Sequence, residues 1–157
     1  MEDNYRLFEL AATNIREQVE EPLYHENLER LAAVPREAQV VYWLWLFQCE
    51  ASLNGIEVFL IDSMGIPQVH EALGMVGARE LVRRLEAAIP WAALGCAEFT
   101  LLPDQSWFNQ FRPVPEFPTL QSVDRPQSGE TVYKVIDGLA DLVAAFIRAN
   151  EEVLFEA

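Results

Sequence analysis

Residues 40–47 read Val-Val-Tyr-Trp-Leu-Trp-Leu-Phe, and this stretch decides the fold. As part of a helix it is apolar on every face, and a helix of that kind is buried on every face. Pro35 suits the first turn of such a helix. We predict one helix over about residues 36–53, buried at the centre of the molecule. Asn54-Gly55 is expected to end it, because both residues tolerate the left-handed backbone conformation that closes a helix.

Helical periodicity extends to both sides of this centre. Asp3 or Asn4 can cap a first helix, which Pro22 ends. Its apolar stripe consists of Phe8, Ala11, Ala12, Ile15 and Val19. Further helices are predicted over residues 27–33, 56–63, 67–75, 78–89 (ended by Pro90) and 137–150. The last of these places Leu139, Leu142, Val143, Phe146 and Ile147 on one apolar face.

The segment 103–129 holds five of the nine prolines and few periodic positions. Because it also contains aromatic residues, among them Trp107 and Phe117, we expect it to pack along the surface of the body. The predicted fold is therefore a single all-α domain over residues 1–157, a compact bundle of about six or seven helices around a central buried helix. The many aromatic residues also suggest a homodimer whose interface takes aromatic side chains from segment 103–129.

The chain has 157 residues, of which 51% are hydrophobic, so it can bury a core without a disulfide or metal. Cys49 and Cys96 lie in apolar surroundings and are expected to be buried thiols. The N-terminus, Met-Glu-Asp-Asn, does not resemble a secretion signal. The strongest apolar run, residues 38–49, is about 18 Å long as a helix, against about 30 Å for a bilayer core. We expect a cytoplasmic protein that does not enter a membrane.

The chain is acidic, with 25 acidic and 11 basic residues and a net charge of −14. Residues 1–33 carry −5 of this charge and residues 130–157 carry −4. Affinity for nucleic acid depends on Lys and Arg bound to phosphates, so the composition argues against direct nucleic-acid binding. It argues equally against docking on an anionic membrane.

Motifs that carry catalysis or metal binding were not found. The chain has no Gly-rich phosphate loop, no Gly-x-Ser-x-Gly, no His-Glu-x-x-His and no Cys-x-x-Cys. Glu21, His25 and Glu29 are spaced four apart, but Pro22 interrupts the helix that would bring them together. His70 is expected at or near the surface. Arg79, Arg83 and Arg84 form a basic face that Glu80 and Glu86 can neutralise. We predict no catalytic, cofactor or metal site, and hence no enzyme.

Two stretches resemble a known family. Residues 50–65 read Glu-Ala-Ser-Leu-Asn-Gly-Ile-Glu-Val-Phe-Leu-Ile-Asp-Ser-Met-Gly, and residues 72–81 read Ala-Leu-Gly-Met-Val-Gly-Ala-Arg-Glu-Leu. Both are similar to blocks of a bacterial family of unknown function that includes an acidic DNA-mimic protein, and the resemblance extends over about residues 27–102 and 137–150. It implies an all-α fold. It also implies a function, which is to occupy the DNA-binding face of a basic protein.

The acidic residues themselves allow two interpretations. Carboxylates three or four residues apart on a helix repeat every ~4.5–6 Å, close to the phosphate spacing of about 3.4 Å along a DNA strand. A DNA mimic would bind a basic DNA-binding protein in this way. The alternative is an immunity-type protein that plugs a toxin or other partner. The predicted partner-binding residues are Glu17, Glu20, Glu21, Glu26, Glu29, Asp137, Asp141, Glu151 and Glu152.

Overall fold

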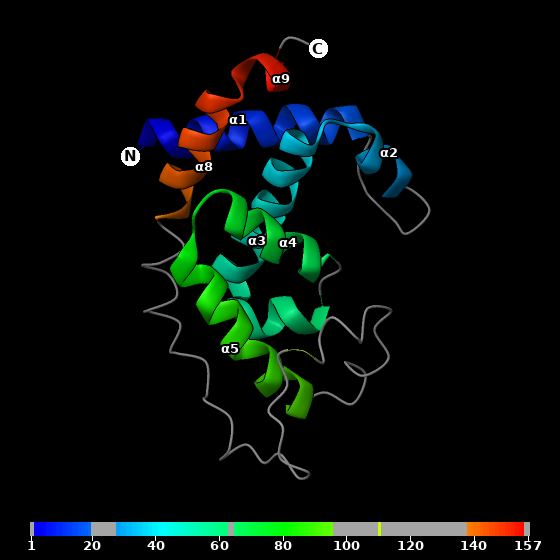
Figure 1. Cartoon of the computed structure of the whole chain (residues 1–157), viewed down its shortest axis with the longest axis vertical. Helices are drawn as coiled ribbons and strands as arrows, with labels where there is room; N and C mark the ends of the chain where they lie inside the picture. The colour runs from blue at the N-terminus through cyan, green and yellow to red at the C-terminus, as the bar shows by residue number, and fades with distance from the viewer. Residues whose placement is uncertain (1, 20–27, 63–64, 96–109, 111–137, 156–157) are drawn as a thin grey trace.

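The computed structural model describes residues 2–19, 28–62, 65–95, 110 and 138–155. In these residues all regular secondary structure is helical, which confirms the predicted all-α class (Figure 1). The helices are α1 (Glu2–Val19), α2 (Leu28–Ala33), α3 (Arg36–Asp62), α4 (Ile66–Met75), α5 (Arg79–Gly95), α8 (Leu139–Ala149) and α9 (Glu151–Phe155). The predicted surface packing of segment 103–129 lies outside the described residues, apart from Gln110.

Helix α3 is the centre of the bundle and contacts each of the other described helices. Its apolar residues from Val40 to Leu44 are all buried, as the composition of this stretch predicts. The predicted end at Asn54-Gly55 is wrong, because α3 continues to Asp62. Gly55 tolerates a left-handed conformation but does not require one. Its cost inside a helix is only about 1 kcal/mol relative to Ala, and a helix packed on all sides can absorb that cost.

Helix α1 packs its predicted stripe into the core, where Phe8, Ala11, Ala12, Ile15 and Val19 are all buried. Aromatic rings join α1 to α3. Phe8 meets Trp45 edge to face with ring centroids 5.1 Å apart, and Tyr5 lies 5.9 Å from the same indole. Trp43 and Trp45 both belong to the core, as predicted. Cys49 is half-buried beside that core rather than fully buried, and Cys96 lies outside the described residues.

Glycines shape the two ends of α4. Gly65 precedes the helix with φ 78°, a left-handed conformation that favours glycine. At the other end, Gly77 has φ 77°. The Ala78 N–H donates to the Leu73 carbonyl at 2.9 Å, and the Gly77 N–H donates to the Gly74 carbonyl at 3.1 Å. These two bonds form a Schellman motif, which turns the chain directly into α5.

The predicted end of α5 at Pro90 is wrong, since the helix runs on to Gly95. A proline inside a helix loses one hydrogen bond and crowds the preceding turn, yet it can kink a helix without ending it. Ile89, directly before the proline, is fully buried and holds this part of α5 against the core. Among the described helices, none is both long and apolar enough to cross a membrane.

Helix α8 packs against α1, so that α1, α8 and α9 lie together at the end of the molecule where both termini are found (Figure 1). The buried face of α8 consists of Leu139, Ala140, Val143, Ala144 and Ile147. Leu142 was predicted to point inward, but it is exposed, and Phe146 is only half-buried. The helix has apolar residues around most of its circumference, so its packing against α1 decides which side is buried.

Candidate partner-binding surface

Five of the nine predicted partner-binding residues lie in the described part of the chain. Glu17, Glu29, Asp141, Glu151 and Glu152 are all exposed. Glu20, Glu21, Glu26 and Asp137 lie outside the described residues. Exposure is the first requirement for binding a partner, and each of these five acids meets it.

The acidic segments from the two ends of the sequence come together through α1 and α8. The Asn4 side chain joins them, because its Nδ2 donates to Asp141 Oδ1 at 2.8 Å while Arg148 Nη2 donates to Asn4 Oδ1 at 2.6 Å. We call α1, α8 and α9 the acidic end. These helices hold seven acidic and three basic residues.

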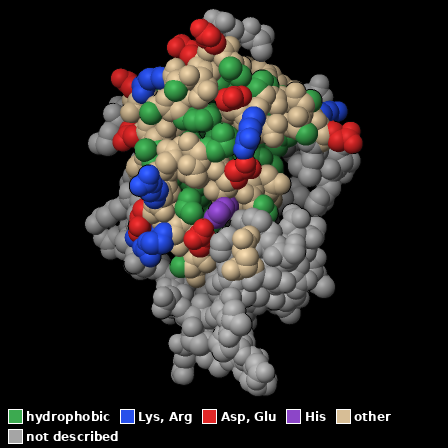
Figure 2. Space-filling model, viewed as in Figure 1, with side chains coloured by type: hydrophobic (Ala, Val, Ile, Leu, Met, Phe, Trp, Pro, Cys, Tyr) green, Lys and Arg blue, Asp and Glu red, His purple; other side chains and the backbone are tan. Residues whose placement is uncertain are grey.

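The opposite part of the described molecule is electrically balanced. Helices α4 and α5 together hold three acidic and three basic residues. Figure 2 shows acidic side chains at the top and upper left of the visible face, over the acidic end, with a basic side chain beside them, while basic and acidic side chains lie side by side over α5 at the lower left. The negative charge of the described helices is therefore carried by the acidic end, which holds seven acidic and three basic residues, and by α3, which holds four acidic residues and one basic residue, and not by α4 and α5.

Within the acidic end, the described carboxylates do not form one regular row. Asp3, Glu9 and Glu17 follow one another along α1 at separations of six and eight residues, or about 9 and 12 Å of helix rise. Those separations exceed the phosphate spacing of about 3.4 Å along a DNA strand. Glu17 is also about 20 Å along α1 from Asn4, where α8 crosses. The described acids thus form two groups, one near each end of α1.

Some of these acids also have a structural role. Asp141 accepts the hydrogen bond from Asn4 that joins α8 to α1. Glu151 and Glu152 occupy the first turn of α9, where the helix dipole favours negative charge. The charges of these three side chains are still accessible to a partner, because all three side chains remain exposed.

Arg83 and Arg84 of α5 pair with Glu80, as predicted. Glu80 accepts two hydrogen bonds from Arg83, at 3.0 and 2.6 Å, and one from Arg84 at 3.0 Å. The hydrogen bonds from Arg83 lower the pKa of Glu80 to about 2, with a smaller contribution from Arg84. The same contact raises the pKa of Arg83.

Two further polar pairs tie α4 to its neighbours. Glu86 was predicted to pair with the arginine face, but its carboxylate lies 2.7 Å from His70 Nε2 and so joins α5 to α4. Arg36 pairs with Glu71 and joins α3 to α4. His70 is half-buried, consistent with its expected place near the surface. These pairs hold the balanced part of the molecule together and add little net charge to its surface.

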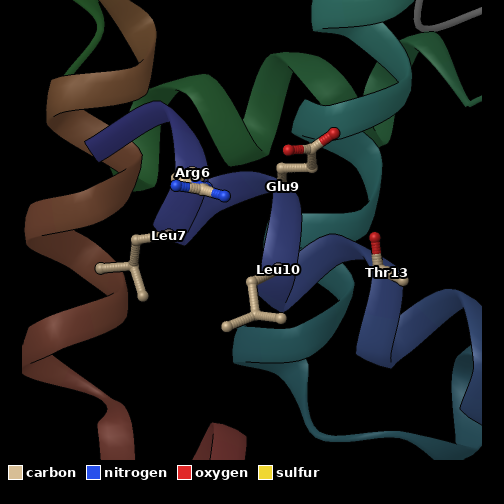
Figure 3. Close-up of a pocket in the computed structure, with 5 residues that line it drawn as sticks. All are labelled: Arg6, Leu7, Glu9, Leu10 and Thr13. Carbon is tan, nitrogen blue, oxygen red and sulfur yellow. The ribbon is translucent and has the colours of Figure 1, made fainter. Parts of the chain in front are cut away.

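Two pockets occur in the described part of the molecule. The first, of about 350 Å³, lies along α1 and is lined by Arg6, Leu7, Glu9, Leu10 and Thr13. Figure 3 shows Leu7 and Leu10 extending toward the side where α8 lies, away from Thr13. The second, of about 260 Å³, lies between α3 and α4, and its lining includes Trp43, Gln39, Gln68 and Met75. Trp43 was predicted only as a core residue, and its place at the edge of a pocket could not be read from periodicity.

Residues suited to metal binding are not gathered in the described ranges, where no group of three His, Cys, Asp or Glu side chains could hold an ion. Of the spaced trio considered above, Glu21 and His25 lie outside those ranges. The absence of catalytic activity stays a prediction. Comparisons with protein-family models, with curated proteins and with solved structures found no match, so the family resemblance also stays a prediction.

Proposed function

We propose that this chain is a non-enzymatic cytoplasmic protein that binds the basic face of a DNA-binding protein and thereby excludes DNA from it. One observation carries the proposal: the packing of α1 against α8, fixed by Asn4, gathers the two acidic terminal segments at one end of the molecule. The sequence resemblance to a family that includes a DNA mimic supports the same function.

Charge distribution explains how such a surface selects its partner. A net charge of −14 attracts basic proteins over several ångströms and repels nucleic acid. Because Arg36 pairs with Glu71, and Arg83 and Arg84 pair with Glu80, these arginines offset little of the field of the acidic end. A DNA-binding face, rich in Lys and Arg, is complementary to that field. The irregular spacing of the carboxylates means that the mimicry rests on charge and position, not on a copy of the phosphate ladder.

A second candidate is a protein that plugs a toxin or another partner through an apolar contact. The exposed Leu10, which is 63% accessible within the α1 pocket, favours this candidate. The two candidates differ in salt dependence, because salt screens charges over a Debye length of about 10 Å at 0.1 M and about 3 Å at 1 M, whereas apolar contacts are not weakened.

Capture from a DNA-binding fraction tests the proposal. The full chain is immobilised, and proteins of the host cell that bind DNA-cellulose are passed over it at 0.1 and 1 M NaCl. We expect capture at the lower concentration only, and we expect duplex DNA added to the captured protein to release it. Capture that is equal at both salt concentrations and insensitive to DNA would contradict mimicry and favour the toxin-plugging candidate.

Matched variants test whether the acidic end is the part of the chain that attracts the partner. Glu151→Gln with Glu152→Gln removes two charges from α9, and Glu37→Gln with Glu50→Gln removes two charges from α3 without breaking the pair of Arg36 with Glu71. We expect the α9 pair to slow association about several-fold and flatten the salt dependence, and the α3 pair to change little. Equal effects from the two pairs would mean that total charge, not its position, attracts the partner.

A further inference from the structure

Helix α8 presents an apolar surface to solvent. Leu142 is 38% exposed, Ala145 and Ala149 are exposed, and Phe146 is half-buried. In α9, Val153 is 40% exposed. We call Leu142, Ala145, Phe146, Ala149 and Val153 the α8 stripe. Its four members in α8 lie at positions i, i+3, i+4 and i+7, the spacing by which an amphipathic helix docks against another helix.

The fold does not account for this surface. The opposite side of α8, with Leu139, Val143 and Ile147, is the one buried in the core. The two charged residues of α8, Asp141 and Arg148, are both engaged with Asn4 of α1. A helix on the surface of a globular protein normally carries polar residues on its outer face. Between Leu142 and Ala149 the one polar residue is Arg148, whose guanidinium is turned to Asn4 of α1, and exposed apolar patches of this kind mark interaction sites.

Acidic residues border the stripe at both ends. Asp141 precedes Leu142, and Glu151 and Glu152 precede Val153. A partner that fits must therefore combine an apolar stripe with flanking Lys or Arg. A second copy of this chain fits poorly, because its own stripe carries the same acids and would bring like charges together.

The dimensions agree with a helix as the partner. Within α8, from Leu142 to Ala149, the stripe spans seven residues, or about 10 Å of helix rise, which corresponds to two turns of a docked helix. Ala145 and Ala149 lie in its middle and permit close approach of a backbone, while Leu142 and Val153 provide larger contacts at the ends. We propose that the α8 stripe binds a basic amphipathic helix of the partner protein. The inference rests on the proposed function and names the partner's recognition element.

A synthetic helix tests the inference. The probe is an 18-residue fluorescent peptide with Leu at every third or fourth position along one face and Lys on the flanking faces. A permuted peptide of identical composition lacks the stripe. We expect the amphipathic peptide to bind the full chain at 0.15 M NaCl, and the permuted peptide to bind at least about tenfold more weakly. Chemical shift changes should map to α8 and α9. Equal binding of both peptides would mean that charge alone attracts them and would overturn the inference.

Variants of the protein complete the test. Leu142→Ser with Val153→Ser should raise the Kd of the amphipathic peptide by about tenfold. Leu10→Ser, an exposed leucine on α1 outside the stripe, should leave it unchanged. All three sites are exposed, so circular dichroism should show an unaltered fold. A wild-type dimer that becomes monomeric in the Leu142→Ser, Val153→Ser variant would show that a second copy occupies the stripe, and would overturn the inference.

The two proposals fail in different ways. In one outcome the α9 charge variant loses salt-sensitive capture, while the stripe variant still binds the peptide and the partner. That outcome supports the proposed function and contradicts the inference about the α8 stripe. If the stripe variant loses peptide binding while the charge variants still capture partners at every salt concentration, the stripe is a binding site and the proposed function falls.

Discussion

The absence of a side chain at position 65 allows Trp43 to pack against the start of α4. Gly65 has φ 78°, and a Cβ added there would lie less than 3.0 Å from three carbons of the Trp43 ring. The indole belongs to the core, and it also borders the pocket between α3 and α4. Position 65 therefore requires glycine for two reasons, its backbone conformation and the space occupied by Trp43.

Gly77 shows the effect of the backbone conformation alone. It has the same left-handed conformation, with φ 77°, but a Cβ there would meet nothing within 4 Å. We expect Gly77→Ala to lower the free energy of unfolding by about 1 kcal/mol through backbone strain alone. Gly65→Ala should cost about 1–3 kcal/mol more, because it adds overpacking against Trp43. Urea denaturation of both variants measures the difference. Equal losses would show that the indole moves aside freely.

Trp45 is the residue on which the contact between α1 and α3 depends most. Its ring meets Phe8 and Tyr5 of α1 and is buried. We expect Trp45→Ala to lower the free energy of unfolding by about 3–5 kcal/mol, the usual cost of truncating a core aromatic residue. The exposed Leu10→Ala serves as control and should change stability by less than about 0.5 kcal/mol. A loss that small for Trp45 would contradict its place in the core.

Glu80 provides a prediction about pH. Its pKa is lowered to about 2 by hydrogen bonds from Arg83, so the carboxylate is favoured in the folded state. A lowered folded pKa means that the stabilising contribution is present above the unfolded value of 4.5 and is lost as the pH falls toward 2. The contribution is small because the pair is exposed. Carbon-detected NMR should show Glu80 titrating well below the ordinary glutamate pKa of 4.5, and Arg83→Gln should move the pKa of Glu80 upward. Titration near 4.5 in the wild-type chain would refute the pairing.

At the scale of the elements, periodicity predicted where helices lie better than where they end. The stripe from Phe8 to Val19 and the all-apolar run of α3 are confirmed, because burial of such faces is the largest favourable term in folding. Asn54-Gly55 and Pro90 are predicted helix ends, but α3 and α5 continue through them. Such residues lower the stability of a helix by a few kcal/mol at most, and tertiary packing can outweigh that penalty.

The continuation of α3 through Gly55 predicts whether a substitution there raises or lowers the free energy of unfolding. A glycine inside a helix is destabilising relative to alanine, so Gly55→Ala should raise the free energy of unfolding by about 0.5–1 kcal/mol. If the helix ended there with Gly55 in a left-handed conformation, as the sequence alone suggests, the same substitution would be destabilising. Thermal unfolding followed by circular dichroism distinguishes the two, with Gly77→Ala as the destabilising reference.

The acidic end and the α8 stripe illustrate what the sequence could not provide. Net charge and its concentration toward both termini were evident from the residues. Whether the two acidic terminal segments come together in space depends on the bond from Asn4 to Asp141, a contact between residues far apart in the chain. Leu142 and Phe146 were assigned to the core with Val143, since a helix that is apolar almost all round gives no signal for which side is buried.

At the scale of the whole molecule, the charge that attracts a partner also opposes folding. A net charge of −14 on 157 residues repels itself in the compact state, and both the acidic end and α3 carry part of the excess negative charge. Opposing this, the pairs of Glu80 with Arg83 and of Arg36 with Glu71 attract, but exposed pairs of this kind contribute little. Repulsion among the negative charges therefore outweighs the attraction within these ion pairs.

Salt should therefore stabilise this protein. Raising NaCl from about 0.05 to 0.5 M shortens the Debye length to only a few ångströms and screens repulsion between separated carboxylates more than attraction within close pairs. We expect the Tm to rise by several degrees over this range. In the Glu151→Gln, Glu152→Gln variant the rise should be smaller than in the wild-type chain, because these substitutions remove two negative charges from the acidic end. A Tm that falls with salt would mean that the ion pairs of α3, α4 and α5 dominate, and that the acidic end does not carry the excess field on which partner binding depends.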